Sequence, residues 1–187
     1  NFNGGITSGT VGEIVNNIEA GTFTNYYGGF GGESADTTII NNIKGGTFTN
    51  YNGGAAGTAA NVVNNISGGN FISDFYPGGM NSTAESVTIN LKTGTFGISA
   101  TMQMVANTVE GQVNLQQLGD DWVAGQTYLA APTAGVAAST KVTGLQSEGA
   151  QNRLAPIYEG NLTKWIAVDK EDLPPFLCKI TDRALST

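Results

Sequence analysis

One phrase occurs three times, nearly unchanged, in the first half of the chain, and it limits the possible folds more than any other feature. The copies are VNNIEAGTFTNYYGG from Val15, INNIKGGTFTNYNGG from Ile40 and VNNISGGNFISDFYPGG from Val63, with a looser copy, TINLKTGTF, from Thr88. Equivalent residues in successive copies are 25, 23 and 25 positions apart. The fold must therefore be built from a unit of this length that contacts copies of itself.

The unit has the sequence pattern of short strands joined by turns. Apolar and β-branched residues alternate with polar ones, and Gly pairs follow them. Paired helices would need roughly 30 or more residues and a propeller blade about 40. Gly and Asn, with 27 and 19 residues, favour turns over helices. The sequence therefore predicts an all-β fold, a parallel β-solenoid in which each unit is one coil and coils lie about 4.8 Å apart.

Such stacking would place equivalent residues in columns along the axis. We expect an internal aromatic stack with an aliphatic column beside it, and Gly at the corner between two strands. The first of each two adjacent Asn should point inward and bond along its column, whereas the second should face solvent or a corner. The alternative is that the Asn pairs only form turns. The expected columns are Phe23, Phe48, Phe71 and Phe96; Ile18, Ile43, Ile66 and Leu91; and Asn16, Asn41 and Asn64.

These Gly-Gly-Thr-Phe units resemble the repeats of right-handed parallel β-helix proteins that gut bacteria secrete or display on their surface. The resemblance covers about residues 1–100, and a degenerate fifth coil is expected from Val113 to Trp122. It implies a single-stranded, right-handed parallel β-helix of about four to five coils. It also implies an extracellular or cell-surface location in a bacterium.

The composition changes after the repeats, and this change predicts two parts. Residues 1–129 are expected to form the coils, and residues 130–187 a linker and a C-terminal β cap or appendage. Such a cap would cover the unpaired strand edges at the end of a solenoid. Two strands are expected in this second part, at 164–168 and 176–181, around a turn at Pro174 and Pro175.

Composition and charge exclude several classes of function. The chain has no His and a single Cys, Cys178, which excludes His-dependent catalytic systems, internal disulfides and His-containing metal sites. Residues 1–135 carry nine acidic residues and two basic ones, Lys44 and Lys92, which argues against nucleic acids and anionic membranes as partners. No apolar run approaches the roughly 18 residues of a membrane-spanning helix. We expect no cofactor, no metal and no membrane insertion.

An enzyme of the polysaccharide lyase or glycoside hydrolase type is the first alternative, because such enzymes occur among β-helix proteins. Glycoside hydrolysis needs two carboxylates about 5–9 Å apart. No acidic residue recurs in one column of the repeats, and we predict no catalytic residue. The carboxylates that enter this comparison are Glu33, Asp36, Asp74, Asp120 and Asp121.

Aromatic residues gather in the Gly-rich stretch that follows each Phe of the column, where strands should give way to loops. Loops projecting along one edge could hold a row of aromatic faces for stacking on sugar rings, with Asn and Asp forming hydrogen bonds. The alternative is that these side chains pack over the corners. The candidate ligand-binding residues are Tyr26, Tyr27, Tyr51, Phe75, Tyr76 and Asp74.

The predicted function is that of a non-catalytic, adhesin-like module of an extracellular or cell-surface bacterial protein. It would display a surface that contacts glycans, or surface proteins of a host or a bacterium, or it would act as a structural stalk. Ice binding is a second alternative, because Thr flanks Phe23 and Phe48 on both sides, but this pattern stops in the later copies.

Overall fold

All regular secondary structure in the described part of the chain is β. The computed structural model describes residues 1–5, 12–29, 36–54, 57–79, 83–92, 94–96, 108–109, 113–118, 124–125, 127–132, 140–145, 152–160 and 162–169. The strands form two parallel sheets and one antiparallel sheet. The expectation of a strand-rich, all-β chain built on parallel sheets is confirmed.

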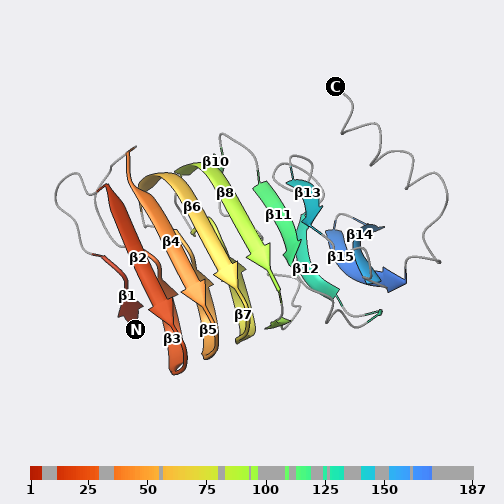
Figure 1. Cartoon of the computed structure of the whole chain (residues 1–187), viewed down its shortest axis with the longest axis horizontal. Helices are drawn as coiled ribbons and strands as arrows, with labels where there is room; N and C mark the ends of the chain where they lie inside the picture. Colours follow the sequence, from red (N-terminus) through yellow and green to blue (C-terminus); the bar gives the residue numbers. More distant parts are fainter. Residues whose placement is uncertain are drawn as a thin grey trace.

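The chain supplies strands to the two parallel sheets alternately (Figure 1). The first sheet contains, in spatial order, β1 (Phe2–Asn3), β3 (Thr22–Tyr27), β5 (Thr47–Asn52), β7 (Asn70–Tyr76) and β9 (Thr95–Phe96). The second contains β2 (Glu13–Ile18), β4 (Thr38–Ile43), β6 (Thr58–Ile66), β8 (Thr83–Leu91), β11 (Val113–Leu118) and β13 (Thr140–Leu145), and β10 (Thr108–Val109) also pairs with β8. Each clear copy of the repeat therefore gives one strand to each sheet.

Equivalent residues of successive repeats are direct register partners. In the second sheet the inner Asn, the outer Asn and the following Ile each pair with their counterparts, and in the first sheet Phe pairs with Phe. The pairing continues from Phe71 to Phe96 and from Ile66 to Leu91. Strand β7 holds one more residue than β5, and the register shifts there between Phe48 and Asn50. The irregular 23-residue spacing is thus accommodated without breaking the columns.

The turn from the second sheet to the first is made by one glycine in each repeat. Gly21, Gly46 and Gly69 have φ of 125°, 103° and 105°. These values lie where a Cβ atom is poorly tolerated, so glycine is the favoured residue. The expectation of a glycine column at the corner is confirmed.

Side chains from both parallel sheets meet in one buried cluster, which also includes Trp165 and Ala167. Those two residues belong to a third, antiparallel sheet of β12 (Thr127–Pro132), β15 (Leu162–Asp169) and β14 (Asn152–Glu159), which lies beyond β11 in Figure 1. The strand expected at 164–168 lies within β15, whereas the one expected at 176–181 and its Pro-Pro turn lie outside the described residues. The boundary at residues 129 and 130 stays a prediction; β12 crosses it and β13 pairs with β11 beyond it.

Candidate functional site

Buried asparagines form a continuous hydrogen-bonded ladder inside the repeats. Asn16 Nδ2 donates to Asn41 Oδ1 at 2.9 Å, and Asn41 Nδ2 donates to Asn64 Oδ1 at 3.0 Å. The same amide nitrogens also donate to the backbone carbonyls of Gly28, Gly53 and Pro77 in the facing turns. The three side chains are buried, as the sequence predicts. The ladder bonds supply partners that a buried amide otherwise lacks, at a cost of several kcal/mol.

Tyrosines of the first sheet complete this ladder. Tyr26 donates its hydroxyl hydrogen to Asn41 Oδ1 at 2.8 Å, and Tyr51 donates to Asn64 Oδ1 at 2.7 Å, so each tyrosine bonds to the asparagine of the next repeat. Burial raises the pKa of both hydroxyls, and for Tyr51 the charge of Tyr26 adds to this effect. Both tyrosines therefore stay protonated hydrogen-bond donors inside the fold.

Two aromatic columns fill the space between the sheets. Phe23, Phe48 and Phe71 stack at centroid distances of 5.1 and 5.0 Å, as expected. The side chain of Phe96 lies outside the described residues. The second column contains Phe2, Tyr26, Tyr51 and Phe75, stacked at 5.1, 5.0 and 5.2 Å. Edge-to-face contacts join the two columns.

The expected placement of the aromatic ligand-binding residues in exposed loops is therefore wrong. Tyr26, Tyr51 and Phe75 lie within strands and are fully buried, and Tyr76 is 8% exposed. The physical reason is that an aromatic ring gains more by packing between the sheets than by projecting into water. Tyr27 and Asp74 are half-buried. Burial, and then the charge of Asp74, raises the pKa of Tyr76.

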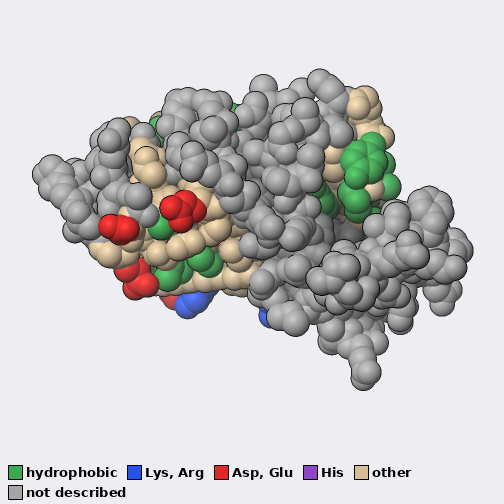
Figure 2. Space-filling model, turned by 90° about the horizontal axis from the view of Figure 1, so that it is seen from above, with side chains coloured by type: hydrophobic (Ala, Val, Ile, Leu, Met, Phe, Trp, Pro, Cys, Tyr) green, Lys and Arg blue, Asp and Glu red, His purple; other side chains and the backbone are tan. Residues whose placement is uncertain are grey.

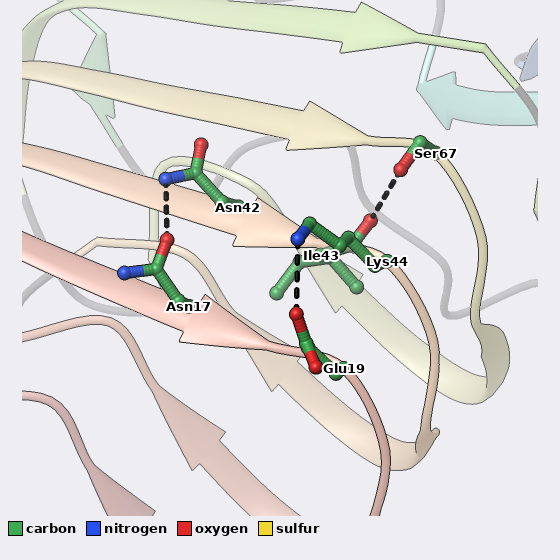
Figure 3. A network of polar contacts seen from close by, with 6 residues as sticks. All are labelled: Asn17, Glu19, Asn42, Ile43, Lys44 and Ser67. Carbon is green, nitrogen blue, oxygen red and sulfur yellow. Dashed lines mark hydrogen bonds and ion pairs between the residues drawn. The ribbon is translucent and has the colours of Figure 1, made fainter.

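The outer surface of the second sheet carries another amide ladder, which faces solvent. Asn42 donates to Asn17, Asn65 to Asn42, and Asn90 to Asn65, at 2.8, 2.7 and 2.7 Å between Nδ2 and Oδ1. The first of these bonds is drawn in Figure 3. Asn90 Oδ1, at the end of this run, is buried and accepts no hydrogen bond among the described residues. The expectation that the second Asn column faces outward is confirmed.

A column of charged and hydroxyl side chains runs beside the outer amides. Lys44 Nζ lies 2.9 Å from Glu19 Oε1, and Ser67 hydrogen-bonds to the Ile43 carbonyl in the next strand (Figure 3). The hydrogen bond from Lys44, and then its charge, holds the pKa of the Glu19 carboxyl below its usual value. Lys92 makes no ion pair with any described residue.

Together the two columns line a shallow open groove of about 320 Å³ on the outer face of the second sheet, named here the amide groove. Its lining is Asn17, Asn42, Lys44, Asn65, Ile66, Ser67, Asn90 and Lys92. The basic side chains visible in Figure 2 lie along a single rim of the molecule, apart from most of the acidic ones. The groove offers amide donors and acceptors at every strand, with ammonium groups at one border.

The carboxylates considered for catalysis are only partly described. Asp36 is exposed, Asp74 is half-buried in the other sheet, and Glu33, Asp120 and Asp121 lie outside the described residues. No group of three or more acidic, Cys or His side chains that could hold a metal ion occurs among the described residues.

Sequence reasoning missed the amide groove, although its signal was present. The outward Asn column is visible in the repeats, and both basic residues of the first 135 occupy the same repeat position, two residues after that Asn. Only aromatic residues were considered as binding groups, so this coincidence went unused.

Comparisons with protein-family models, with curated proteins and with solved structures find no match to this chain. Among the described residues, no helix is long and apolar enough to span a membrane.

Proposed function

We propose that the chain is a non-catalytic β-solenoid module in which each pair of strands is one coil of a right-handed parallel β-helix. The alternation of strands between two parallel sheets supports this, as does the direct register between equivalent residues. Buried polar and aromatic ladders along the same direction support it further. The right hand rests on the general preference of parallel crossover connections.

The module belongs to an adhesin-like protein outside the cell or on the surface of a bacterium, and it displays the amide groove to glycans. The observation that carries this role is the outward ladder of four amides in register, which borders two lysines. An amide nitrogen has two hydrogens, and the ladder uses one of them in each of Asn42, Asn65 and Asn90. The second hydrogen and the remaining oxygen lone pairs suit the hydroxyl groups of sugars.

The ladder also lowers the entropy cost of binding. Each amide is already held by its neighbours, so a ligand does not have to immobilise it. A polymer lying across successive strands would meet the same groups at intervals of about 4.8 Å. This arrangement favours a linear glycan over a single sugar.

A glycan array tests the proposal with a matched pair of variants. Asn65→Ala removes an amide from the groove, while Asn50→Ala removes one from a similar ladder on the first sheet, where Asn50 donates to Asn25 at 2.7 Å and Asn25 to Asn1 at 3.0 Å. Both losses disturb a partly or fully exposed ladder to a similar extent. We expect glycan signals from the unaltered chain that fall severalfold with Asn65→Ala and persist with Asn50→Ala.

Two results would count against this role. Equal loss with both variants would place binding elsewhere or reflect instability, which urea denaturation of each variant would identify. Absence of signal across plant, mucin and bacterial glycans would leave the chain as a structural stalk.

A further inference from the structure

The two basic residues of the first 135 occupy one groove. That segment carries nine acidic residues against Lys44 and Lys92. Both lysines line the amide groove, at the same position of the second and fourth repeats. An acidic segment that brings its two positive charges to the border of a polar groove forms a local region of attraction for anions.

The two lysines differ in how accessible their charge is. Lys92 is exposed and makes no ion pair with a described residue. Lys44 is paired with Glu19, but the two side chains are 63% and 74% exposed. Exposed pairs of this kind contribute little stability, so an incoming carboxylate can compete with Glu19 for Lys44.

The spacing of the lysines limits the kind of anion. They lie two strands apart, on β4 and β8 with β6 between, which corresponds to about 10 Å along the stack. No single carboxylate reaches both ammonium groups at that separation. A linear polymer with carboxylates on alternate sugars can contact both while its hydroxyl groups meet the amides between them.

We propose that the amide groove binds a linear acidic polysaccharide, whose carboxylates pair with Lys92 and Lys44 and whose hydroxyls bond to the Asn17, Asn42, Asn65 and Asn90 ladder. This inference rests on the glycan-binding role proposed above and narrows its ligand class. Glu19 is a competitor for Lys44 and thus weakens binding. Charge and register together select an acidic polymer over a neutral one.

The test compares hyaluronan and alginate with the carboxyl-reduced form of each polymer, using biolayer interferometry on the whole chain at low ionic strength. Both acidic polymers are expected to bind more tightly than their reduced forms. Lys92→Gln should lower affinity for the acidic polymers about two- to fivefold, as for loss of one exposed ion pair. Glu19→Gln should raise it by about the same factor, because Lys44 is released.

The control is Lys164→Gln, on β15 in the third sheet, where Lys164 pairs with Glu159. It removes the same charge from the chain and should leave affinity unchanged. The opposite signs expected for Lys92→Gln and Glu19→Gln separate a binding effect from general destabilisation, which lowers affinity in both.

The inference is overturned if neither acidic polymer binds, or if acidic and reduced forms bind equally and neither charge variant changes affinity. Binding of reduced polymers that Asn65→Ala abolishes would then preserve the glycan-binding role and remove only the acidic ligand class. Failure of every polymer, acidic and reduced, together with an empty glycan array, would overturn the proposed role itself.

Discussion

At the scale of single residues, the inner amide ladder owes its stability to complete pairing of buried polar atoms. Asn41 donates to Gly53 and to Asn64 and accepts from Asn16 and from Tyr26, so both of its hydrogens and two oxygen lone pairs are used. A buried amide is tolerated only when its partners are present. Each Tyr thus depends on the Asn of the following repeat.

The sequence follows this dependence where the ladder stops. Ile89 is the register partner of Asn64 and carries no polar group, and Phe75, the partner of Tyr51, carries no hydroxyl. A Tyr at position 75 would have no acceptor at position 89. At the opposite end Phe2 pairs with Tyr26 although Asn16 follows it, so the matched replacement applies to the later repeats.

This matching predicts a coupled pair of substitutions. Phe75→Tyr places a buried hydroxyl opposite Ile89 and should cost about 1–3 kcal/mol of unfolding free energy. Ile89→Asn alone should also destabilise, since it buries an amide with an incomplete set of partners. The double variant should be more stable than the sum of the two losses by about 1–2 kcal/mol. Urea denaturation of all four proteins gives the coupling energy, and additive losses would contradict the matching.

At the scale of elements, the turns after each first-sheet strand approach one another closely. Gly28 and Gly53 lie in the same column, and the Gly53 and Pro77 carbonyls that accept from Asn41 and Asn64 are directly adjacent to them. A Cβ atom on Gly53 would clash with the Pro77 carbonyl and the Asn64 side chain. These glycines are needed for contact between repeats, because none of the described positive φ values belongs to them.

Alanine substitution distinguishes this close approach from ordinary surface positions. Gly53→Ala should lower the unfolding free energy by about 1–3 kcal/mol, the range for overpacking a buried site. Gly12→Ala, where an added Cβ meets no atom within 4 Å, should change it by no more than about 0.5 kcal/mol. Urea denaturation followed by circular dichroism measures both. Equal effects would mean that the turns separate easily.

At the scale of the whole molecule, a stack of similar units can lose one unit if the new neighbours match. Stability in such arrays is the sum of unit terms and nearest-neighbour contacts. Deletion of residues 38–60 would bring Tyr26 opposite Asn64, a compatible pair. Deletion of residues 61–85 would bring Tyr51 opposite Ile89, which offers its hydroxyl no acceptor.

Both deletions should retain parallel β structure, and the first should be more stable than the second by about 1–3 kcal/mol, the cost of an unsatisfied buried hydroxyl. Far-UV circular dichroism and urea denaturation check the two expectations. Collapse of both deletions to an unfolded chain would argue against independent coils. Equal stability would argue against order being encoded by the Tyr and Asn pairs.

Much of the fold followed from the repeats because stacked strands turn sequence periodicity directly into spatial contact. Asn16, Asn41 and Asn64 share the spacing of Ile18 and its equivalents, and this was enough to predict their burial. The Phe column and the glycine corners were predictable for the same reason. No alternative pairing of the repeats keeps all of these columns aligned.

The position of Tyr26 and Tyr51 was decided by tertiary structure. Phe48 and Tyr51 are both fully buried although they are three residues apart, a spacing that an evenly alternating strand cannot place on one face. Their inward position depends on the bent path of the strand and on an acceptor in the next repeat. The amide groove is likewise a property of stacked strands, because Lys44 and Lys92 are 48 residues apart in sequence. Local sequence thus determined which residues stack, and packing between the sheets decided which aromatic groups are buried and which polar groups reach solvent.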